Sequence, residues 1–209
     1  MVLDETLPPT GRDGPPQLIL ASKSPRRREL LRQIGLTAEV RSADVDETPT
    51  SGEAPADYVL RIALAKARAV RAALGTGTAA QPVLAADTAV ICDDRILGKP
   101  ADAAEAARML ELLSGRTHRV LTGVALLGTA ERTAVSSTRV WLRAVSAAEA
   151  AAYWASGEPQ DKAGGYALQG LGAVFVERLE GSWSGVVGLP LFETAQLLAA
   201  EGLPLLSAD

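Results

Sequence analysis

The sequence predicts an α/β fold built on a mixed β-sheet. Up to residue 92, short apolar runs alternate with amphipathic helical stretches, which is typical of strands joined by helices. From residue 118, two strand-like runs follow each other with only a short turn between them, and such runs pair antiparallel. No repeat or linker interrupts residues 17–209, so we expect a single domain there. The Pro- and Gly-rich residues 1–16 predict a flexible tail.

The first half of the chain predicts three strands and two helices. The strands are expected at 17–21, 38–47 and 82–92, and the helices at 25–34 and 54–75. The first and last of these strands are continuous apolar runs, whereas the middle one alternates and ends in acids. Ser24 suits the N-cap of the first helix and Pro25 its first turn, and Gly75 is expected to end the second helix.

The second half predicts a hairpin turn with a short return in "DDRILGKP", followed by more strands and helices. The strands are expected at 118–128, 132–145 and 173–181, and the helices at 102–114, 146–157 and 190–201. Asp102 suits the N-cap of the first of these helices. The stretches 157–172 and 182–190 are rich in Gly and turn residues, so we expect loops there.

Composition limits the class of protein. The chain has 209 residues, 47% of them apolar, which is enough for a sizeable core. It carries 21 Lys and Arg against 25 Asp and Glu, and this acidic balance argues against a general nucleic-acid binder. Cys92 is the only cysteine, and no apolar run approaches the ~18–20 residues of a membrane helix. We therefore expect a cytoplasmic protein without a disulfide.

Three arginines, Arg26 to Arg28, stand at the start of the helix 25–34. A helix N-terminus already carries partial positive charge, so each cation there costs about 0.3–1 kcal/mol. An anion held jointly by the helix end and the guanidinium groups would offset that cost. Because the protein as a whole is acidic, the local cluster suits a small anionic ligand better than a polyanion.

Asp87 stands inside an otherwise apolar strand, in "VLAADTAVIC". A buried carboxylate is costly unless it is paired or bound to a metal. Asp87 is therefore either the acid of a structural ion pair with an arginine or a general base or metal ligand, and the residues alone leave both open. Asp46 and Glu47 offer a second carboxylate. Two acids among Arg and Lys residues suit Mg²⁺- or Mn²⁺-assisted attack on a phosphate ester.

Several other chemistries are excluded by their missing motifs. The sequence has no G-x-x-x-x-G-K-[ST] loop and no G-x-S-x-G elbow. "GYALQGLG" precedes an expected strand rather than a helix, so it is not a dinucleotide-binding turn. The single histidine, His118, is expected to be structural. Lys66 and Lys99, each taken alone, are more typical of solvated surface lysines than of a site.

Five stretches, in order along the chain, resemble the successive motifs of the Maf family of nucleoside triphosphate pyrophosphatases. They are "LASKSPRRRELL", "AADTAVICDDRILGKP", "LSGRTHRVLTGVAL", "SGEPQDKAGGYALQGLGAVFVERLEG" and "VVGLPL". The resemblance implies an elongated, curved mixed sheet flanked by helices, akin to the inosine triphosphatase fold, with a cleft between two lobes. It also implies metal-dependent cleavage of a nucleotide between the α and β phosphates.

The resemblance carries roles onto individual residues. Asp87 becomes the proton acceptor and, with Glu47, a ligand of the divalent metal. The residues that would line the triphosphate site are Ser22, Arg26, Arg27, Lys66, Lys99, Asp161 and Lys162. Three positions that divide the family by base preference read Arg27, Thr88 and Gln169, similar to the subgroup that acts on dTTP and UTP. Family members are often dimers, so we expect a homodimer.

Two alternatives to a pyrimidine pyrophosphatase stay open. The same arginines would serve a non-catalytic module that binds a nucleotide or nucleic acid and regulates cell division. Asp87 speaks against it, because an acid facing phosphates weakens their binding. The other alternative is a pyrophosphatase for non-canonical purine nucleotides, against which Thr88 and Gln169 speak only weakly.

Overall fold

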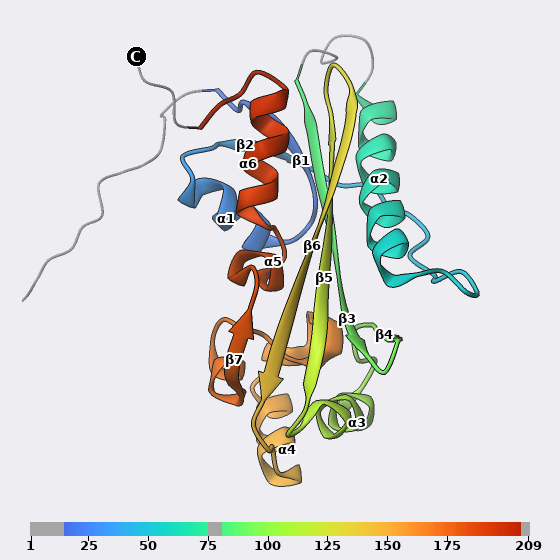
Figure 1. The fold of residues 1–209 in the computed structure, drawn as a ribbon, viewed down its shortest axis with the longest axis vertical. Helices are drawn as coiled ribbons and strands as arrows, with labels where there is room; N and C mark the ends of the chain where they lie inside the picture. Colours follow the sequence, from blue (N-terminus) through green and yellow to red (C-terminus); the bar gives the residue numbers. More distant parts are fainter. Residues whose placement is uncertain (1–14, 75–80, 206–209) are drawn as a thin grey trace, which may run out of the picture.

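A mixed sheet of seven strands forms the centre of the molecule, and its three longest strands run along the long axis (Figure 1). This computed structural model describes residues 15–74 and 81–205. Across the sheet the strands lie in the order β2 (Ala38–Arg41), β1 (Leu18–Ala21), β3 (Val83–Cys92), β5 (Thr117–Leu127), β6 (Glu131–Leu142) and β7 (Val176–Glu180), while β4 (Arg95–Leu97) pairs with β3. Only the β1 pairings are parallel, which confirms the predicted mixed sheet.

Helices cover both faces of this sheet, as predicted. They are α1 (Pro25–Gln33), α2 (Pro55–Ala73), α3 (Ala103–Leu113), α4 (Ala147–Ala155), α5 (Trp183–Val187) and α6 (Leu191–Ala200). In Figure 1, α1, α5 and α6 lie on one side of the long strands and α2 on the other, while α3 and α4 gather at the opposite end. Among the described residues, no helix combines the length and the apolar character that a membrane crossing requires.

The alternation of β3 divides its side chains between the two faces of the sheet. Val83 and Ala85 pack with α2, whereas Leu84 and Ala86 belong to the core that includes residues of α1 and α6. Because successive side chains of a strand point to opposite faces, Asp87 continues the series that faces α2. Thr88 continues the other series. Two neighbouring polar residues are thus presented on opposite faces of the same strand.

One edge of β3 is open where these polar residues lie. The other edge is paired with β5 from Val83 to Ile91. On the open side, β1 pairs with Val83 and Leu84, and β4 pairs with Val90 to Cys92. In the registers of the described strands, residues 85–89 have no strand partner on that side. Asp87 and Thr88 therefore lie at a gap in the sheet, where a ligand can reach both faces.

Three predicted strands run several residues past the observed ones, and one of them, expected at 132–145, ends at Leu142. The strand expected at 38–47 ends at Arg41, because its partner β1 ends at Ala21 and leaves the residues beyond without a neighbour to pair with. The strand expected at 173–181 begins only at Val176, and residues 171–175 form a short 3₁₀ helix. Residues 42–47 alternate beyond the point where a pairing strand is available, whereas residues 173–175 are a continuous apolar run that belongs to the 3₁₀ helix.

The stretch 182–190, predicted as a loop, contains the short helix α5. Ser182 caps it, because its Oγ accepts the backbone N–H of Gly185 at 3.0 Å. Asp102 caps α3 as predicted, accepting from the N–H of Glu105 at 2.8 Å. Ser24 occupies the N-cap of α1 but makes no capping bond with its side chain. The predicted helix end at Gly75 and most of the predicted tail 1–16 lie outside the described residues.

Candidate active site

A cavity of about 870 Å³ lies at the open edge of β3. Its walls come from both ends of the molecule, since residues of α1 and α2 line it together with residues near β4 and in the 158–172 stretch. Every residue to which the family resemblance gives a role lines this cavity: Ser22, Arg26, Arg27, Glu47, Lys66, Asp87, Thr88, Lys99, Asp161, Lys162 and Gln169. Segments more than a hundred residues apart are thus brought together.

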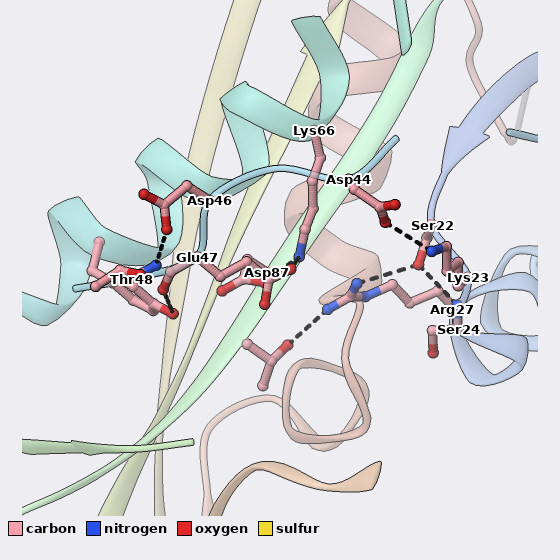
Figure 2. Close-up of polar contacts among 12 residues, drawn as sticks. Ser22, Lys23, Ser24, Arg27, Asp44, Asp46, Glu47, Thr48, Lys66 and Asp87 are labelled. Carbon is pink, nitrogen blue, oxygen red and sulfur yellow. Dashed lines mark hydrogen bonds and ion pairs between the residues drawn. The ribbon is translucent and has the colours of Figure 1, made fainter. Parts of the chain in front are cut away.

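Asp87, Lys66 and Glu47 form the acidic centre of the cavity (Figure 2). Lys66 Nζ lies 2.7 Å from Asp87 Oδ1 and 2.7 Å from Glu47 Oε1. Lys66 comes from the middle of α2, where the small, fully buried Ala63 and Ala67 let the helix lie close to the sheet. The partner of Asp87 is therefore a lysine shared with a second carboxylate, not the arginine of a simple structural ion pair.

Burial raises the pKa of the Asp87 carboxyl, while the neighbouring Lys66 ammonium acts in the opposite direction. Asp87 is 7% exposed, so the carboxylate is largely removed from water. A group whose charged form is disfavoured by burial accepts a proton more readily than a solvated aspartate. Asp87 is thus suited to take a proton from a water molecule in the cavity.

Tyr58 is a member of the site that the sequence analysis did not identify. Its hydroxyl donates to the backbone carbonyl of Glu47 at 3.0 Å and so holds the segment that carries the second carboxylate. Burial, together with the nearby Asp87 charge, raises the pKa of Tyr58 to about 12, which keeps the hydroxyl protonated. The sequence did contain a signal for Tyr58: Tyr58, Ile62 and Lys66 are spaced four residues apart, which places them on one face of α2.

The arginines at the start of α1 have different environments. Arg27 Nε donates to Gly188 O at 2.7 Å, and its Nη1 and Nη2 donate to Ser22 Oγ and Thr88 Oγ1, each at 3.3 Å. Burial lowers the pKa of the Arg27 guanidinium, although acceptors surround it. Arg26 Nη2 lies 3.8 Å from Asp161 Oδ2. Arg28 is exposed and does not line the cavity, so two of the three arginines face it.

The 158–172 stretch supplies a further part of the cavity wall. Asp161 forms an ion pair with its neighbour Lys162 and lies near Arg26, so it holds two cations at the cavity. Gln169 and Lys99 are exposed. Within the described part of the chain their side chains make no hydrogen bond or ion pair, so they are available to a ligand.

Glu158 organises this stretch, although the sequence analysis did not single it out. Its carboxylate accepts the Tyr153 hydroxyl at 2.8 Å and the backbone N–H groups of Leu171 and Gly172 at 2.8 and 2.9 Å. These bonds tie the beginning of the stretch to its end. Glu158 precedes Asp161 by three residues, and Gln169 lies just before the bonded amides, so Glu158 sets the geometry of the wall.

Of the two candidates for a second carboxylate, only Glu47 joins the centre. Asp46 is exposed and accepts the N–H of Thr48 at 2.9 Å, turning away from the cavity. Asp44 forms an exposed ion pair with Lys23. Consecutive residues of an extended segment point in opposite directions, so only one of the two neighbouring acids can face Lys66.

Glu47 and Asp87 could hold a divalent cation, since both carboxylates converge on the same atom, Lys66 Nζ. Among residues 15–74 and 81–205, no group of three or more His, Cys, Asp or Glu side chains is placed to bind a metal. The pair of carboxylates suits Mg²⁺ or Mn²⁺, because Mg²⁺ binds through one or two carboxylates together with substrate phosphates and waters.

His118 lies outside the cavity and is buried, in keeping with the structural role expected for it. Its Nε2 is 2.7 Å from the hydroxyl of Tyr166, whose ring it meets edge to face. Burial lowers the pKa of His118 to about 4, so the ring is neutral at physiological pH. This contact fixes Tyr166, in the middle of the 158–172 stretch, to β5.

Comparison with known proteins gives one family and many relatives. The family described as Maf-like protein matches residues 17–201. A dTTP/UTP pyrophosphatase of Alkalilimnicola ehrlichii is 55% identical over 185 residues, which cover 88% of this chain and 92% of that protein. One of Myxococcus xanthus is 56% identical over 188 residues, covering 90% and 94%. Among solved structures, the Staphylococcus aureus Ham1 protein overlaps with a TM-score of 0.43 and 16% identity, over 60% of this chain and 71% of that one.

Proposed function

This chain belongs to the Maf family, and we propose that it hydrolyses dTTP, UTP and modified pyrimidine nucleotides to the monophosphate and pyrophosphate. It is a nucleoside triphosphate pyrophosphatase. Relatives more than half identical over most of the chain carry the name dTTP/UTP pyrophosphatase. The observation that carries the proposal is the Asp87–Lys66–Glu47 centre inside a cavity lined by further cations.

Three cationic side chains of the cavity bind the triphosphate. Arg26, Lys99 and Lys162 line the cavity from three separate segments, so they can surround several phosphates at once. Two of them already lie at a carboxylate, that of Asp161, and phosphate oxygens are equally suitable acceptors for them. Their charge favours departure of pyrophosphate, on which negative charge develops as the bond breaks.

Asp87 takes the proton of the attacking water. The water oxygen forms a bond to the α-phosphorus, the bond from that phosphorus to the bridging oxygen breaks, and pyrophosphate leaves with the electron pair. Lys66 keeps Asp87 oriented and partly offsets the effect of burial on its charge. This geometry is that of a general base with one positioning partner.

Glu47 and Asp87 would hold Mg²⁺ or Mn²⁺, which when bound neutralises phosphate charge and lowers the pKa of a coordinated water. Thr88 and Gln169 are available for the edge of the base, since both line the cavity and neither is charged. Gln169 is exposed and can meet a base from the open side. Hydrogen bonds rather than stacking would then choose the base.

Pyrophosphate release tests the proposal. Wild type and Asp87→Asn are compared on dTTP, UTP, CTP and purine triphosphates, with Mg²⁺, with Mn²⁺ and with a chelator. We expect fast turnover of dTTP and UTP that needs metal and falls at least about a thousandfold in the variant, because a removed base cannot be replaced by bulk water. Turnover of purines alone would preserve the reaction and refute the substrate. Nucleotide binding by both proteins without any turnover would support the non-catalytic module.

The proposal includes three further expectations. The residues from 17 onward are one catalytic domain, the protein forms a homodimer as members of the family often do, and it acts in the cytoplasm on free nucleotides. Light scattering during size-exclusion chromatography measures the mass in solution. Limited proteolysis of residues 1–16, followed by the pyrophosphate assay, shows whether the remaining domain is active alone.

A further inference from the structure

A chain of hydrogen bonds connects Arg27 to the short helix α5 through two threonines. Arg27 Nη2 donates to Thr88 Oγ1 at 3.3 Å, Thr88 Oγ1 lies 2.9 Å from Thr122 Oγ1, and Thr122 Oγ1 lies 2.8 Å from Gly185 O. Thr88 and Thr122 are direct partners in the β3–β5 register. Thr122 is 1% exposed, so it cannot reach a ligand itself.

The direction of every bond in this chain is determined. Gly185 O is a carbonyl and only accepts, so the single hydroxyl proton of Thr122 goes to it. Thr122 can then only accept from Thr88, which must give its own proton to Thr122. At its other side Thr88 accepts from Arg27. Thr88 has no proton left for a ligand, and it keeps acceptor capacity.

The cavity therefore presents a defined pair of groups beside Gly188. Arg27 offers only donors, and Nη1 and Nη2 each keep one N–H beyond the bonds to Ser22 and Thr88. Thr88 offers only an acceptor. A ligand edge that matches both must bring a carbonyl next to an N–H.

We infer that Thr122 selects uracil and thymine over cytosine by holding the Thr88 hydroxyl as an acceptor toward the cavity. The inference rests on the proposed function and deepens it. Uracil and thymine carry N3–H between two carbonyls, so a carbonyl can face Arg27 while N3–H faces Thr88. Cytosine has a bare N3 with a lone pair, which would face the lone pair of Thr88. A site whose polar group is left unpaired by the wrong base rejects that base strongly.

Thr122→Val and Thr122→Ser test this role, with kcat/KM for UTP and CTP as the readout. The two nucleotides share ribose and triphosphate, so their ratio cancels effects on phosphate binding or on Asp87. In Thr122→Val the Thr88 proton is free to turn toward the base, and we expect the UTP/CTP ratio to fall about tenfold, the equivalent of one hydrogen bond. Thr122→Ser keeps the hydroxyl and should keep the ratio.

Thr194→Val is the matched control. Thr194 is fully buried in α6, and its hydroxyl has no hydrogen-bond partner among the described residues. This variant loses a buried hydroxyl without touching the chain of bonds, so its UTP/CTP ratio should equal that of wild type. A fall in UTP and CTP turnover by the same factor in Thr122→Val would overturn the inference. That result would leave the proposed function intact. The proposed function itself would be refuted if the wild-type enzyme did not hydrolyse UTP.

Wild-type enzyme provides an independent test should Thr122→Val fail to fold. The triphosphate of 3-methyluridine lacks the N3–H, and that of 5-methyluridine carries the same added methyl group elsewhere on the ring. We expect the 3-methyl compound to have a kcat/KM at least about tenfold below that of the 5-methyl compound, because only the former loses the donor for Thr88. Equal values for the two compounds would refute the acceptor role of Thr88.

Discussion

Asp87 and Gly123 lie opposite each other in the antiparallel β3–β5 ladder, and α2 contacts the sheet at Gly123. A Cβ atom at position 123 would lie 2.6 Å from both the carbonyl carbon and the carbonyl oxygen of Val59. Only a glycine allows the helix backbone to come this close. Lys66 lies about two turns further along the same helix. The absence of a side chain at Gly123 therefore determines how close Lys66 comes to Asp87.

We expect Gly123→Ala to lower both stability and activity. The added methyl group meets backbone rather than a flexible side chain, so α2 must shift, at a cost of about 1–3 kcal/mol in the free energy of unfolding. The shift separates Lys66 from Asp87, and kcat should fall at least about tenfold, since catalysis depends on sub-ångström placement. Urea unfolding and pyrophosphate release measure the two effects.

Gly98→Ala is the control for stability, because a Cβ at Gly98 meets no atom within 4 Å. Its free energy of unfolding should stay within about 0.5 kcal/mol of wild type. If Gly123→Ala were as stable and as active as wild type, the close approach of α2 would have no part in placing Lys66.

Lys66→Met should destabilise the protein by about 2–3 kcal/mol, because it leaves the buried Asp87 carboxylate without its cation. Full burial would cost more, but the Lys66 and Asp87 side chains remain 16% and 10% exposed. Adding Asp87→Asn to Lys66→Met removes the unpaired charge and should recover most of the loss. Urea unfolding at neutral pH of both single variants and the double variant forms the cycle. Additive losses in the double variant would show that the two groups do not stabilise each other.

Glu158→Gln should raise KM for the nucleotide about tenfold or more with a smaller change in kcat, because Glu158 shapes the wall and does not touch the reacting atoms. Its two carboxylate oxygens accept from Tyr153, Leu171 and Gly172, and an amide would turn one acceptor into a donor facing a backbone N–H. Hydrogen exchange of the Leu171 and Gly172 amides reports the loosening directly. Unchanged exchange together with unchanged KM would remove Glu158 from the organisation of the site.

Much of the fold was predictable because most elements have local signals. The apolar run of β3, the Ser-Pro start of α1 and the Asp102 cap of α3 are all encoded within a few residues, and the structure confirms them. The errors arose where a distant partner decides. Residues 42–47 alternate like a strand, but β1 is too short to pair with them. Helix α5 has five residues and depends on the Ser182 cap.

The site residues likewise divide into those with a local sequence signal and those whose role depends on distant partners. Asp87 was detectable because a carboxylate in an apolar strand is a local anomaly. Lys66 drew attention only through the family resemblance, because a lysine in an amphipathic helix has no anomaly of its own. Thr122 and Gly123 were not singled out, since their roles come from the β3–β5 register, which pairs them with Thr88 and Asp87. The register of two strands cannot be deduced from the sequence before their pairing is known.

The neutral, buried His118 should make stability fall as the pH is lowered. Its pKa is about 4 in the folded protein and 6.5 in the unfolded chain, so between these values the unfolded chain binds a proton that the folded protein does not. Its contribution is complete above pH 6.5 and is lost as the pH falls toward 4, by about 2 kcal/mol between pH 7 and pH 5. Urea unfolding of wild type and His118→Gln across this range isolates the effect, because the carboxylates common to both proteins cancel in the difference. Glutamine can still bond to the Tyr166 hydroxyl but does not titrate, so the difference should shrink steadily as the pH falls. A difference that is independent of pH would mean that His118 is protonated as readily in the fold as in the unfolded chain, and that burial does not control it.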